Sequence, residues 1–399
     1  MDVRIVEPGP LGGKARTETI APGWRIERGP HSFTGRADAL RALAHSLGLG
    51  DRIEPVGAHA RSRFLLRGAR LRRAGPGMLA SWPILSGLFR RVEDPSDVSV
   101  RDWFSSRLGD RFAEGPLGAM TAGIWATSPD RVDMAAGFPA IREGVRTHGS
   151  IAAAFLRRER GVVGTFSLQG GLGSIGDAAR IALGQTGVAN VAADGLAADA
   201  AGWTVTTVQG SLHADAVVLA GDAAASAALL TTVSLGAAAA LSAMEYSPLA
   251  VAHWIAADAQ YPRGFGFLAE PASRMHSLGT LFTSDILPDR APAGLRSFTT
   301  MFSDPDVADE AVRTALLAEH RALTGRDVAI AGLHVVRHPR AVAVPRPGHA
   351  ARVAALQANL PPGIALAGAY LGAGAMEDAV RSGLAAAVAI LAERRRHAA

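Results

Sequence analysis

The chain of 399 residues is 48% hydrophobic and 19% charged, with 41 basic and 36 acidic residues and a net charge of +5. This composition excludes a disordered protein, and the length suffices for two or three domains with substantial cores. The absence of cysteine excludes disulfides, thiol nucleophiles and thiolate metal sites, so any redox chemistry belongs to a bound cofactor.

The basic residues are mostly dispersed arginines, with one short cluster at residues 394–396. Nucleic-acid binding requires clustered basic residues interleaved with aromatic ones, so we expect no nucleic-acid partner. The sequence has no N-terminal signal pattern, and no apolar run reaches the roughly 20 residues that span a bilayer. We therefore expect a cytoplasmic protein that either stays in solution or lies on a membrane surface without crossing it.

The first 33 residues predict a strand followed by two loops. Residues 3–6 favour a strand that ends at Glu7, and a turn at residues 8–10 follows. A carboxylate at the end of a strand is typical of a dinucleotide-binding sheet, where it accepts hydrogen bonds from ribose hydroxyls. A surface glutamate that closes an ordinary strand is the alternative. The two loops contain Gly12, Gly13, Lys14, Arg16 and Thr17, then Gly29, Pro30, His31, Ser32 and Phe33.

In this order the three segments resemble the flavin-containing amine oxidase and protoporphyrinogen oxidase superfamily, and within it the oxygen-dependent protoporphyrinogen oxidases. The resemblance implies FAD as the cofactor, with Glu7 at the ribose. Glycine suits the two loops because the backbone can approach a cofactor closely. The loop residues implied to contact the pyrophosphate, the ribose or the isoalloxazine are Gly12, Gly13, Lys14, Arg16, Gly29, Pro30, His31 and Ser32.

One part of the family pattern is absent from the sequence. Members of the family begin with a strand, a Gly-x-Gly-x-x-Gly turn and a helix whose N-terminus receives the pyrophosphate, whereas this sequence begins at the expected second strand. We expect either a start site placed too late or a truncated gene. The 399-residue protein is then expected to be colourless or insoluble, and a form extended by one βα unit to carry flavin.

Residues 37–49 have the apolar spacing of an amphipathic helix, and residues 63–71 predict a hairpin that turns at Arg67 and Gly68. The resemblance implies that Arg63 pairs with a propionate of the substrate, and an ordinary exposed strand arginine is the alternative. The following segment, residues 76–149, predicts a helical insertion. Its apolar stretch 78–89, followed by Arg90 and Arg91, is typical either of plain core or of a membrane anchor. The resemblance favours the anchor.

Gly171, Gly173 and Gly176 form a literal Gly-x-Gly-x-x-Gly, with Asp194 about twenty residues further on. The resemblance assigns this segment to an internal element that precedes a helix, so we do not expect it to hold the pyrophosphate. It also implies that the backbone of Val191, at the end of a short strand at residues 187–191, faces the adenine.

Further strands are predicted at residues 203–208 and 214–220, a helix at 235–244, and strands of a second sheet at 247–254 and 264–268. Residues 278–292 match a motif of the protoporphyrinogen oxidases almost letter for letter. The resemblance implies that Leu268 and Phe282 line the substrate cavity, with Phe282 stacked on a tetrapyrrole ring. A core aromatic is the alternative for Phe282. We expect His338 and His349 to be surface or capping histidines, and no metal-binding pattern occurs.

Residues 364–396 predict a strand, a glycine-rich turn and a long helix. Free N–H groups at the start of such a helix can bind a flavin carbonyl or a phosphate oxygen. The resemblance identifies this segment as a second FAD signature, with contacts from Gly368, Gly372, Gly374 and Val380.

The predicted fold class is α/β (α+β). A doubly wound FAD-binding domain that lacks its first βα unit takes residues 1–57, 150–220 and 350–399. A mixed-sheet substrate-binding domain takes residues 58–75 and 221–349, and the helical membrane-interaction insertion takes residues 76–149.

The resemblance implies oxidation of protoporphyrinogen IX to protoporphyrin IX in heme biosynthesis. Hydride passes from a methylene bridge to the flavin, oxygen reoxidises the flavin, and no side chain acts as catalytic acid or base. The expected partners are a tetrapyrrole, oxygen and a membrane surface. The alternatives are coproporphyrinogen III oxidation, an amine oxidase or desaturase activity, and a non-catalytic remnant.

Overall fold

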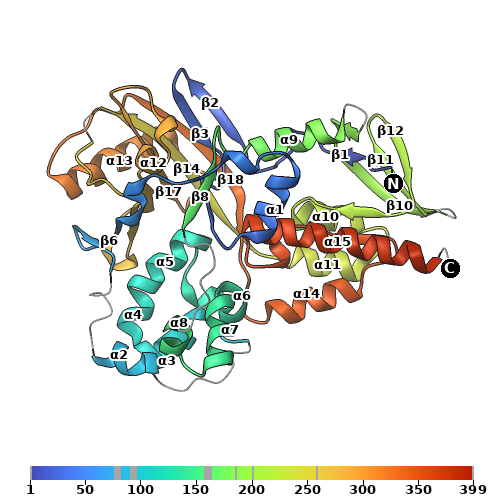
Figure 1. Ribbon diagram of the computed structural model, residues 1–399, viewed down its shortest axis with the longest axis horizontal. Helices are drawn as coiled ribbons and strands as arrows, with labels where there is room; N and C mark the ends of the chain where they lie inside the picture. Colours follow the sequence, from blue (N-terminus) through green and yellow to red (C-terminus); the bar gives the residue numbers. More distant parts are fainter. Residues whose placement is uncertain are drawn as a thin grey trace.

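The computed structural model describes residues 2–75, 82–89, 97–156, 164–184, 187–199, 202–257 and 259–397. Figure 1 shows a large sheet with helix α13 (Asp309–Thr324) at one end of the molecule and a group of helices, α2 to α8, beside it. Helix α15 (Met376–His397) and both chain termini lie at the opposite end.

Seven strands form the largest sheet, in the order β18 (Gly332–Ala343), β14 (Tyr246–Ala256), β17 (Arg296–Phe302), β16 (Ser277–Leu281), β15 (Gly266–Ala269), β6 (Arg63–Arg67) and β7 (Arg70–Arg73). Neighbouring strands are antiparallel except β15 and β6, which are parallel. One face carries an aromatic core that includes Trp254, Phe267 and Phe298, and Val312 and Leu316 of α13 belong to the same core. The mixed sheet predicted from the sequence is therefore confirmed.

The strands of the predicted nucleotide-binding part occur as two separate parallel pairs. One pair is β1 (Ile5–Val6) with β9 (Val188–Ala189), and the other is β13 (Val217–Leu219) with β19 (Ile364–Leu366). No strand within the described ranges joins the two pairs into one sheet. The predicted doubly wound domain without its first βα unit stays a prediction. The strand predicted to begin at Ala214 begins only at Val217, because Ala214 still pairs with Trp203 in a preceding hairpin.

That hairpin belongs to an antiparallel meander of β10 (Ala193–Asp199), β11 (Gly202–Thr207) and β12 (Gly210–Ala214). Helices α10 (Ala223–Leu230), α11 (Leu235–Ser242) and α14 (His349–Ala358) follow in the chain. Trp203, Leu219 and Leu241 share a buried cluster, so the meander, the second parallel pair and these helices pack around one core. Helix α11 confirms the helix predicted at residues 235–244.

The predicted helical insertion comprises α2 (Trp82–Phe89), α3 (Val100–Leu108), α4 (Asp110–Glu114), α5 (Pro116–Trp125), α6 (Met134–Gly137) and α7 (Pro139–His148), and α8 (Ile151–Leu156) follows. Its core contains Trp103, Phe104 and Trp125. Residues 78–81 of the predicted anchor, together with Arg90 and Arg91, lie outside the described residues, while the side chain of Phe89 is exposed. Within the described ranges no helix combines the length and apolarity that crossing a membrane requires.

The remaining strands connect these parts. The hairpin of β2 (Thr17–Ala21) and β3 (Trp24–Glu27) follows the first loop, and β4 (Phe33–Thr34), β8 (Thr165–Leu168) and β5 (Ile53–Pro55) form a small sheet. Helix α1 (Asp38–Ser46) confirms the predicted amphipathic helix. Its N-terminus is capped by Glu377 of α15, whose carboxylate accepts hydrogen bonds from the N–H groups of Ala39 (3.1 Å) and Leu40 (2.9 Å).

The three glycines of the Gly-x-Gly-x-x-Gly segment are packed against protein. A Cβ on Gly176 would overlap the carbonyl oxygen of Leu11, and one on Gly173 would lie 2.6 Å from the nitrogen of Thr17. A Cβ on Gly171 would also overlap the Thr17 side chain. The glycines thus allow helix α9 (Ser174–Leu183) and the loop before it to pack closely on residues 11–17, which explains the pattern without a phosphate.

Candidate functional site

The loops assigned to the cofactor lie close together because glycine permits near contact of their backbones. A Cβ on Gly29 would lie 2.5 Å from the carbonyl oxygen of Lys14, and one on Gly374 would lie 2.8 Å from that of Ala343. The Lys14 ammonium donates to the carbonyl oxygens of Arg340 and Ala341. The structure therefore brings the loop of residues 12–16, the loop of residues 29–32, the end of β18 and the C-terminal glycine turn to one place.

The two cations of the first loop are already held by protein groups. Besides its two carbonyl acceptors, Lys14 has its ammonium 5.6 Å from the centre of the Tyr246 ring, and burial lowers its pKa while Asp222 opposes that shift. Arg16 pairs with Glu18 at 2.5 Å, and Arg28 pairs with the same carboxylate at 3.1 Å. A phosphate would have to compete with these partners for Lys14 and Arg16.

The positions assigned to the ribose and the adenine meet at the end of the β1–β9 pair. The backbone N–H groups of Glu7 and Val191 both donate to the carbonyl oxygen of Ala189, at 3.0 and 2.9 Å. The carboxylate of Glu7 accepts a hydrogen bond from the N–H of Gly9 at 3.0 Å, which leaves its second oxygen for a hydroxyl donor. Glu7 and Val191 therefore lie side by side, as one nucleoside would require.

The C-terminal glycine turn is fixed from both sides. Asp378 accepts hydrogen bonds from the N–H groups of Ala373 (3.0 Å) and Ala375 (2.9 Å), and the indole of Trp125 donates to the carbonyl oxygen of Ala373 at 2.7 Å. The N–H of Gly368 donates to Ser382 at 2.9 Å. Val380 packs against the cluster that contains α1. Of the four residues assigned here, Gly368 and Val380 thus serve internal packing in this structure.

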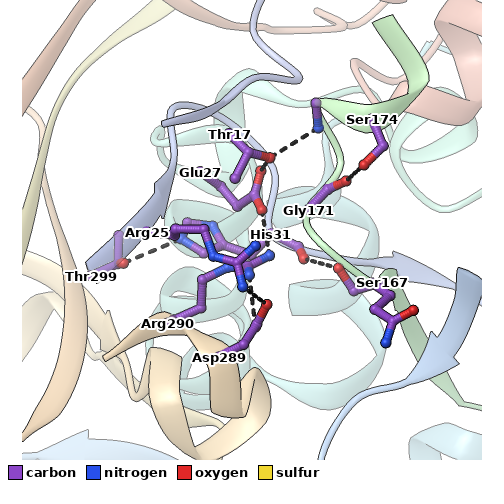
Figure 2. A network of polar contacts seen from close by, with 12 residues as sticks. Thr17, Arg25, Glu27, His31, Ser167, Gly171, Ser174, Asp289, Arg290 and Thr299 are labelled. Carbon is purple, nitrogen blue, oxygen red and sulfur yellow. Dashed lines mark hydrogen bonds and ion pairs between the residues drawn. The ribbon is translucent and has the colours of Figure 1, made fainter. Parts of the chain in front are cut away.

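A buried ion pair joins the N-terminal hairpin to the large sheet (Figure 2). Arg290, in the turn before β17, donates to Glu27 of β3 at 2.8 Å, and the two side chains are 1% and 0% exposed. The hydroxyl of Thr17 donates to the second oxygen of Glu27 at 2.8 Å and accepts from the N–H of Gly173 at 3.0 Å. Burial raises the pKa of Glu27, an effect that the Arg290 guanidinium and the Thr17 hydroxyl partly offset.

Sequence reasoning missed this pair. Arg290 lies inside the matched motif at residues 278–292, and Glu27 stands two residues before Gly29, but nothing in the spacing shows that they meet. The two positions are 263 residues apart. The available signal was the charge of Arg290 within a motif made largely of apolar and turn residues.

Similarity to known proteins identifies the family of this chain. A model described as "Flavin containing amine oxidoreductase" matches residues 1–391. The chain belongs to this family. FAD is accordingly its cofactor.

Similar proteins include the protoporphyrinogen oxidase of Macaca fascicularis, which is 27% identical over 96% of this chain and 91% of its own. The coproporphyrinogen III oxidase of Mycobacterium leprae is 25% identical over 92% of this chain and 88% of its own. A structure provisionally assigned as a protoporphyrinogen oxidase, from Exiguobacterium sp. 255-15, superposes with a TM-score of 0.85 at 21% identity, covering 99% of this chain and 93% of that one.

The described residues of this flavoprotein fit the cofactor in part. The glycine loops and the Glu7–Val191 pair suit the isoalloxazine and nucleoside ends, and a groove of about 780 Å³ along β19, α14 and α15 includes Gly372. The pyrophosphate part of the cofactor is fitted less well, because phosphates favour helix N-termini with free N–H groups. The carboxylate of Glu377 occupies the first free N–H groups of α1. The carboxylate of Asp378, bound to the N–H groups of Ala373 and Ala375 just before α15, would repel a phosphate at the start of that helix.

Two of the three residues assigned to the substrate share one face of the large sheet. Arg63 is opposite Gly266, and Leu268 is opposite Leu65 in the parallel pair β6–β15. Paired residues and their second neighbours along a strand point to the same face. The exposed guanidinium of Arg63 lies 4.2 Å from the centre of the Phe265 ring and donates to Thr165 at 3.3 Å. Leu268 packs against Gly123 of α5.

Phe282 is on the other face, and its predicted stacking on a tetrapyrrole is corrected. Its side chain is 0% exposed and stacks on Tyr261 at 5.2 Å, with Phe64, Phe267 and Phe298 around it. No surface of the ring is open to a ligand, so in this structure Phe282 is the core aromatic that the sequence allowed as the alternative.

His31 belongs to a buried polar cluster on the Arg63 face. Its Nε2 lies 3.2 Å from the hydroxyl of Thr299, which also contacts Nδ1 of His253 (3.1 Å) and the hydroxyl of Thr283 (2.8 Å). A threonine hydroxyl donates only one hydrogen bond, so at least two of these three partners donate to it. At least one of the two imidazoles therefore carries its proton at the atom facing Thr299.

Both imidazoles of this cluster are neutral at neutral pH. Burial lowers the pKa of His31 to about 4, with the Arg290 cation as a second cause, and burial lowers the pKa of His253 well below its usual value. Nε2 of His253 has no hydrogen-bond partner among the described residues. His338 and His349, expected to be surface or capping histidines, are half-buried and buried, and Nε2 of His338 contacts the carbonyl oxygen of Arg28 at 2.7 Å.

The buried ion pair predicts an asymmetric mutational response. Arg290→Met leaves the Glu27 carboxylate buried without its cation and should lower the free energy of unfolding by about 3 to 5 kcal/mol. The double variant Glu27→Gln/Arg290→Met removes both charges and should recover most of that loss, as measured by denaturant unfolding. Arg321→Met, which removes an exposed partner of Asp327, is the matched control and should change stability little. A double variant no more stable than Arg290→Met would contradict this account.

The buried histidine predicts a loss of stability in mild acid. The pKa of His31 is about 4 in the folded protein and 6.5 in the unfolded chain. Between these two pH values the His31 imidazole is protonated in the unfolded chain and neutral in the folded protein. Stability is therefore complete above pH 6.5 and falls by about 3 kcal/mol as the pH drops toward 4. His31→Gln should flatten this part of the stability profile, and His253 should still contribute in the same direction. An unchanged slope in the variant would show that His31 is not the titrating group.

Proposed function

We propose that this flavoprotein oxidises a porphyrinogen to a porphyrin with oxygen as the final electron acceptor. The observation that carries the proposal is a row of paired residues across the Arg63 face of the large sheet. In register, Arg63 is followed by Gly266, Leu281, Thr299 and His253 on successive strands. Strands lie about 4.8 Å apart, so roughly 14 Å separate Arg63 from Thr299. That span suits a tetrapyrrole with a carboxylate at one end.

The two ends of the row have complementary chemistry. Arg63, fixed by Phe265 and Thr165, supplies a charge-assisted hydrogen bond to a substrate carboxylate. At the other end, His31 comes from the loop that the resemblance places beside the isoalloxazine, and it contacts Thr299. A substrate held by its carboxylate at Arg63 would thus extend along the sheet as far as the loop with His31, which contacts the buried Thr299.

The bound flavin would supply the acceptor for each hydride from the substrate. Full oxidation of a porphyrinogen removes six electrons and six protons in three such steps, and three molecules of oxygen become hydrogen peroxide. The chain's own residues would bind and orient the substrate. The neutral His31 and His253 place no competing cation near the reacting carbons.

Two porphyrinogens are candidate substrates. Protoporphyrinogen IX is supported by the names of the similar human, macaque, bovine and chloroplast proteins. Coproporphyrinogen III is supported by the names of the similar proteins of Bacillus subtilis and Mycobacterium leprae. The buried position of Phe282 removes one argument for a tetrapyrrole over an amine, so the proposal now depends on Arg63 and the row of residues. Contact of residues 78–89 with a membrane surface stays a prediction.

The proposal predicts a specific loss on truncating Arg63. In protein supplied with excess FAD, Arg63→Ala should lower kcat/KM for porphyrinogen oxidation by an amount equivalent to about 1.5 to 3 kcal/mol of transition-state binding. The rate is measured from the increase in porphyrin fluorescence. Arg321→Ala, at an exposed position on α13, should leave the rate unchanged. A wild-type protein that binds flavin but forms no porphyrin would exclude the function, whereas equal rates in both variants would remove only Arg63 from the site.

A further inference from the structure

The edge hairpin β6–β7 presents an unusual concentration of arginine. Residues 61–73 contain six arginines and no acidic residue. All six are exposed, and they are Arg61, Arg63, Arg67, Arg70, Arg72 and Arg73. An exposed edge strand often carries charge to prevent aggregation, but a single sign of charge at this density also attracts anions.

Four of these arginines share one face of the hairpin. Arg67 is directly opposite Arg70, and Leu65 is opposite Arg72, so Arg72 lies diagonally between Arg63 and Arg67. Like charges directly opposite each other destabilise a strand pair. The arrangement is therefore unfavourable for the hairpin itself, and an anionic ligand would relieve it. We call Arg63, Arg67, Arg70 and Arg72 the arginine face.

Protein carboxylates neutralise little of this charge. Among the described residues one carboxylate, that of Glu270, forms an ion pair with the arginine face, through Arg67 at 2.9 Å. Arg63 is held by a ring and a hydroxyl instead. Arg70 and Arg72 form no ion pair with a described residue, and both are solvent-exposed. The face therefore keeps about three cations for a ligand, of which Arg63 and Arg72 are diagonal neighbours, about 7 Å apart by strand geometry.

The position of the arginine face links it to the substrate row. Arg63 belongs to both, and Leu65, which points the same way, is opposite Leu268. The arginine face thus continues, beyond the sheet edge, the same face that carries Thr299 and His253. A lipid surface fits less well, because no large hydrophobic side chain of residues 61–75 is exposed for insertion among headgroups.

We propose that the arginine face binds several substrate carboxylates at once, with Arg72 and Arg70 acting beside Arg63, so that a tetracarboxylate tetrapyrrole is preferred over a dicarboxylate one. This inference rests on the proposed function and narrows its substrate class. Arg63 and Arg72 hold the two neighbouring propionates that both kinds of tetrapyrrole carry, and Arg70 attracts the further carboxylates that only the tetracarboxylate has. The contribution is electrostatic and partly exposed, so added salt weakens it.

The test compares the binding of two stable porphyrins, coproporphyrin III with four carboxylates and protoporphyrin IX with two. Binding to the purified protein is measured by fluorescence titration. Wild-type protein should bind coproporphyrin III more tightly, and the preference should shrink as salt rises. Arg70→Gln/Arg72→Gln should weaken coproporphyrin III binding about tenfold or more and protoporphyrin IX binding less, because only coproporphyrin III also loses the attraction of Arg70 for its further carboxylates. Arg72→Lys, which keeps the charge, should retain part of the difference.

The matched control is Arg321→Gln/Arg326→Gln, which removes two exposed arginines at the end of α13 and should leave both affinities unchanged. If both porphyrins bind equally, or the hairpin variant binds both like wild type, the inference is wrong while the proposed function stands. If neither porphyrin binds the wild-type protein, the proposed function fails with it. Loss of anionic-liposome sedimentation in the hairpin variant, with porphyrin binding intact, would assign the face to a membrane and overturn the inference.

Discussion

The buried pair of Glu27 and Arg290 is the interaction on which the site depends, because it links three segments that are far apart in the sequence. Glu27 closes the N-terminal hairpin, Arg290 begins the approach to β17, and Thr17 extends the network to the loop at Gly173. A buried ion pair need not add net stability, but it penalises any arrangement in which one partner is buried alone. The pair therefore favours the single arrangement that brings the loop with His31 to Thr299.

Glycine supplies the second constraint, close packing of backbones. Gly29 against Lys14, Gly374 against Ala343 and Gly176 against Leu11 are contacts that a Cβ would forbid. In all three places glycine allows protein segments to pack closely on one another. For this reason the pattern at residues 171–176 could not be distinguished from a phosphate loop by spacing alone, and the structure shows what its glycines contact.

Much of the fold could be predicted from local patterns. The periodicity at residues 37–49 gave helix α1, and the apolar strand around Trp254 gave β14, because burial on one face imposes a regular spacing. The site was harder, since its contacts are long-range. The sequence could not show that Phe282 points to the face opposite Arg63, because one residue of register decides the face. Nor could it show that His253 and His31 share Thr299, since three separate strands and loops contribute to that contact.

The central claim is that a porphyrinogen, held by arginine along one face of the large sheet, reduces the flavin of this protein. The most direct test is to mix the FAD-loaded protein anaerobically with either a porphyrinogen or a primary amine. The quantity measured is the flavin absorbance near its long-wavelength maximum. The account predicts that the porphyrinogen bleaches the flavin and that the amine does not. Bleaching by the amine alone, or a bound flavin that stays oxidised with every porphyrinogen, would contradict it.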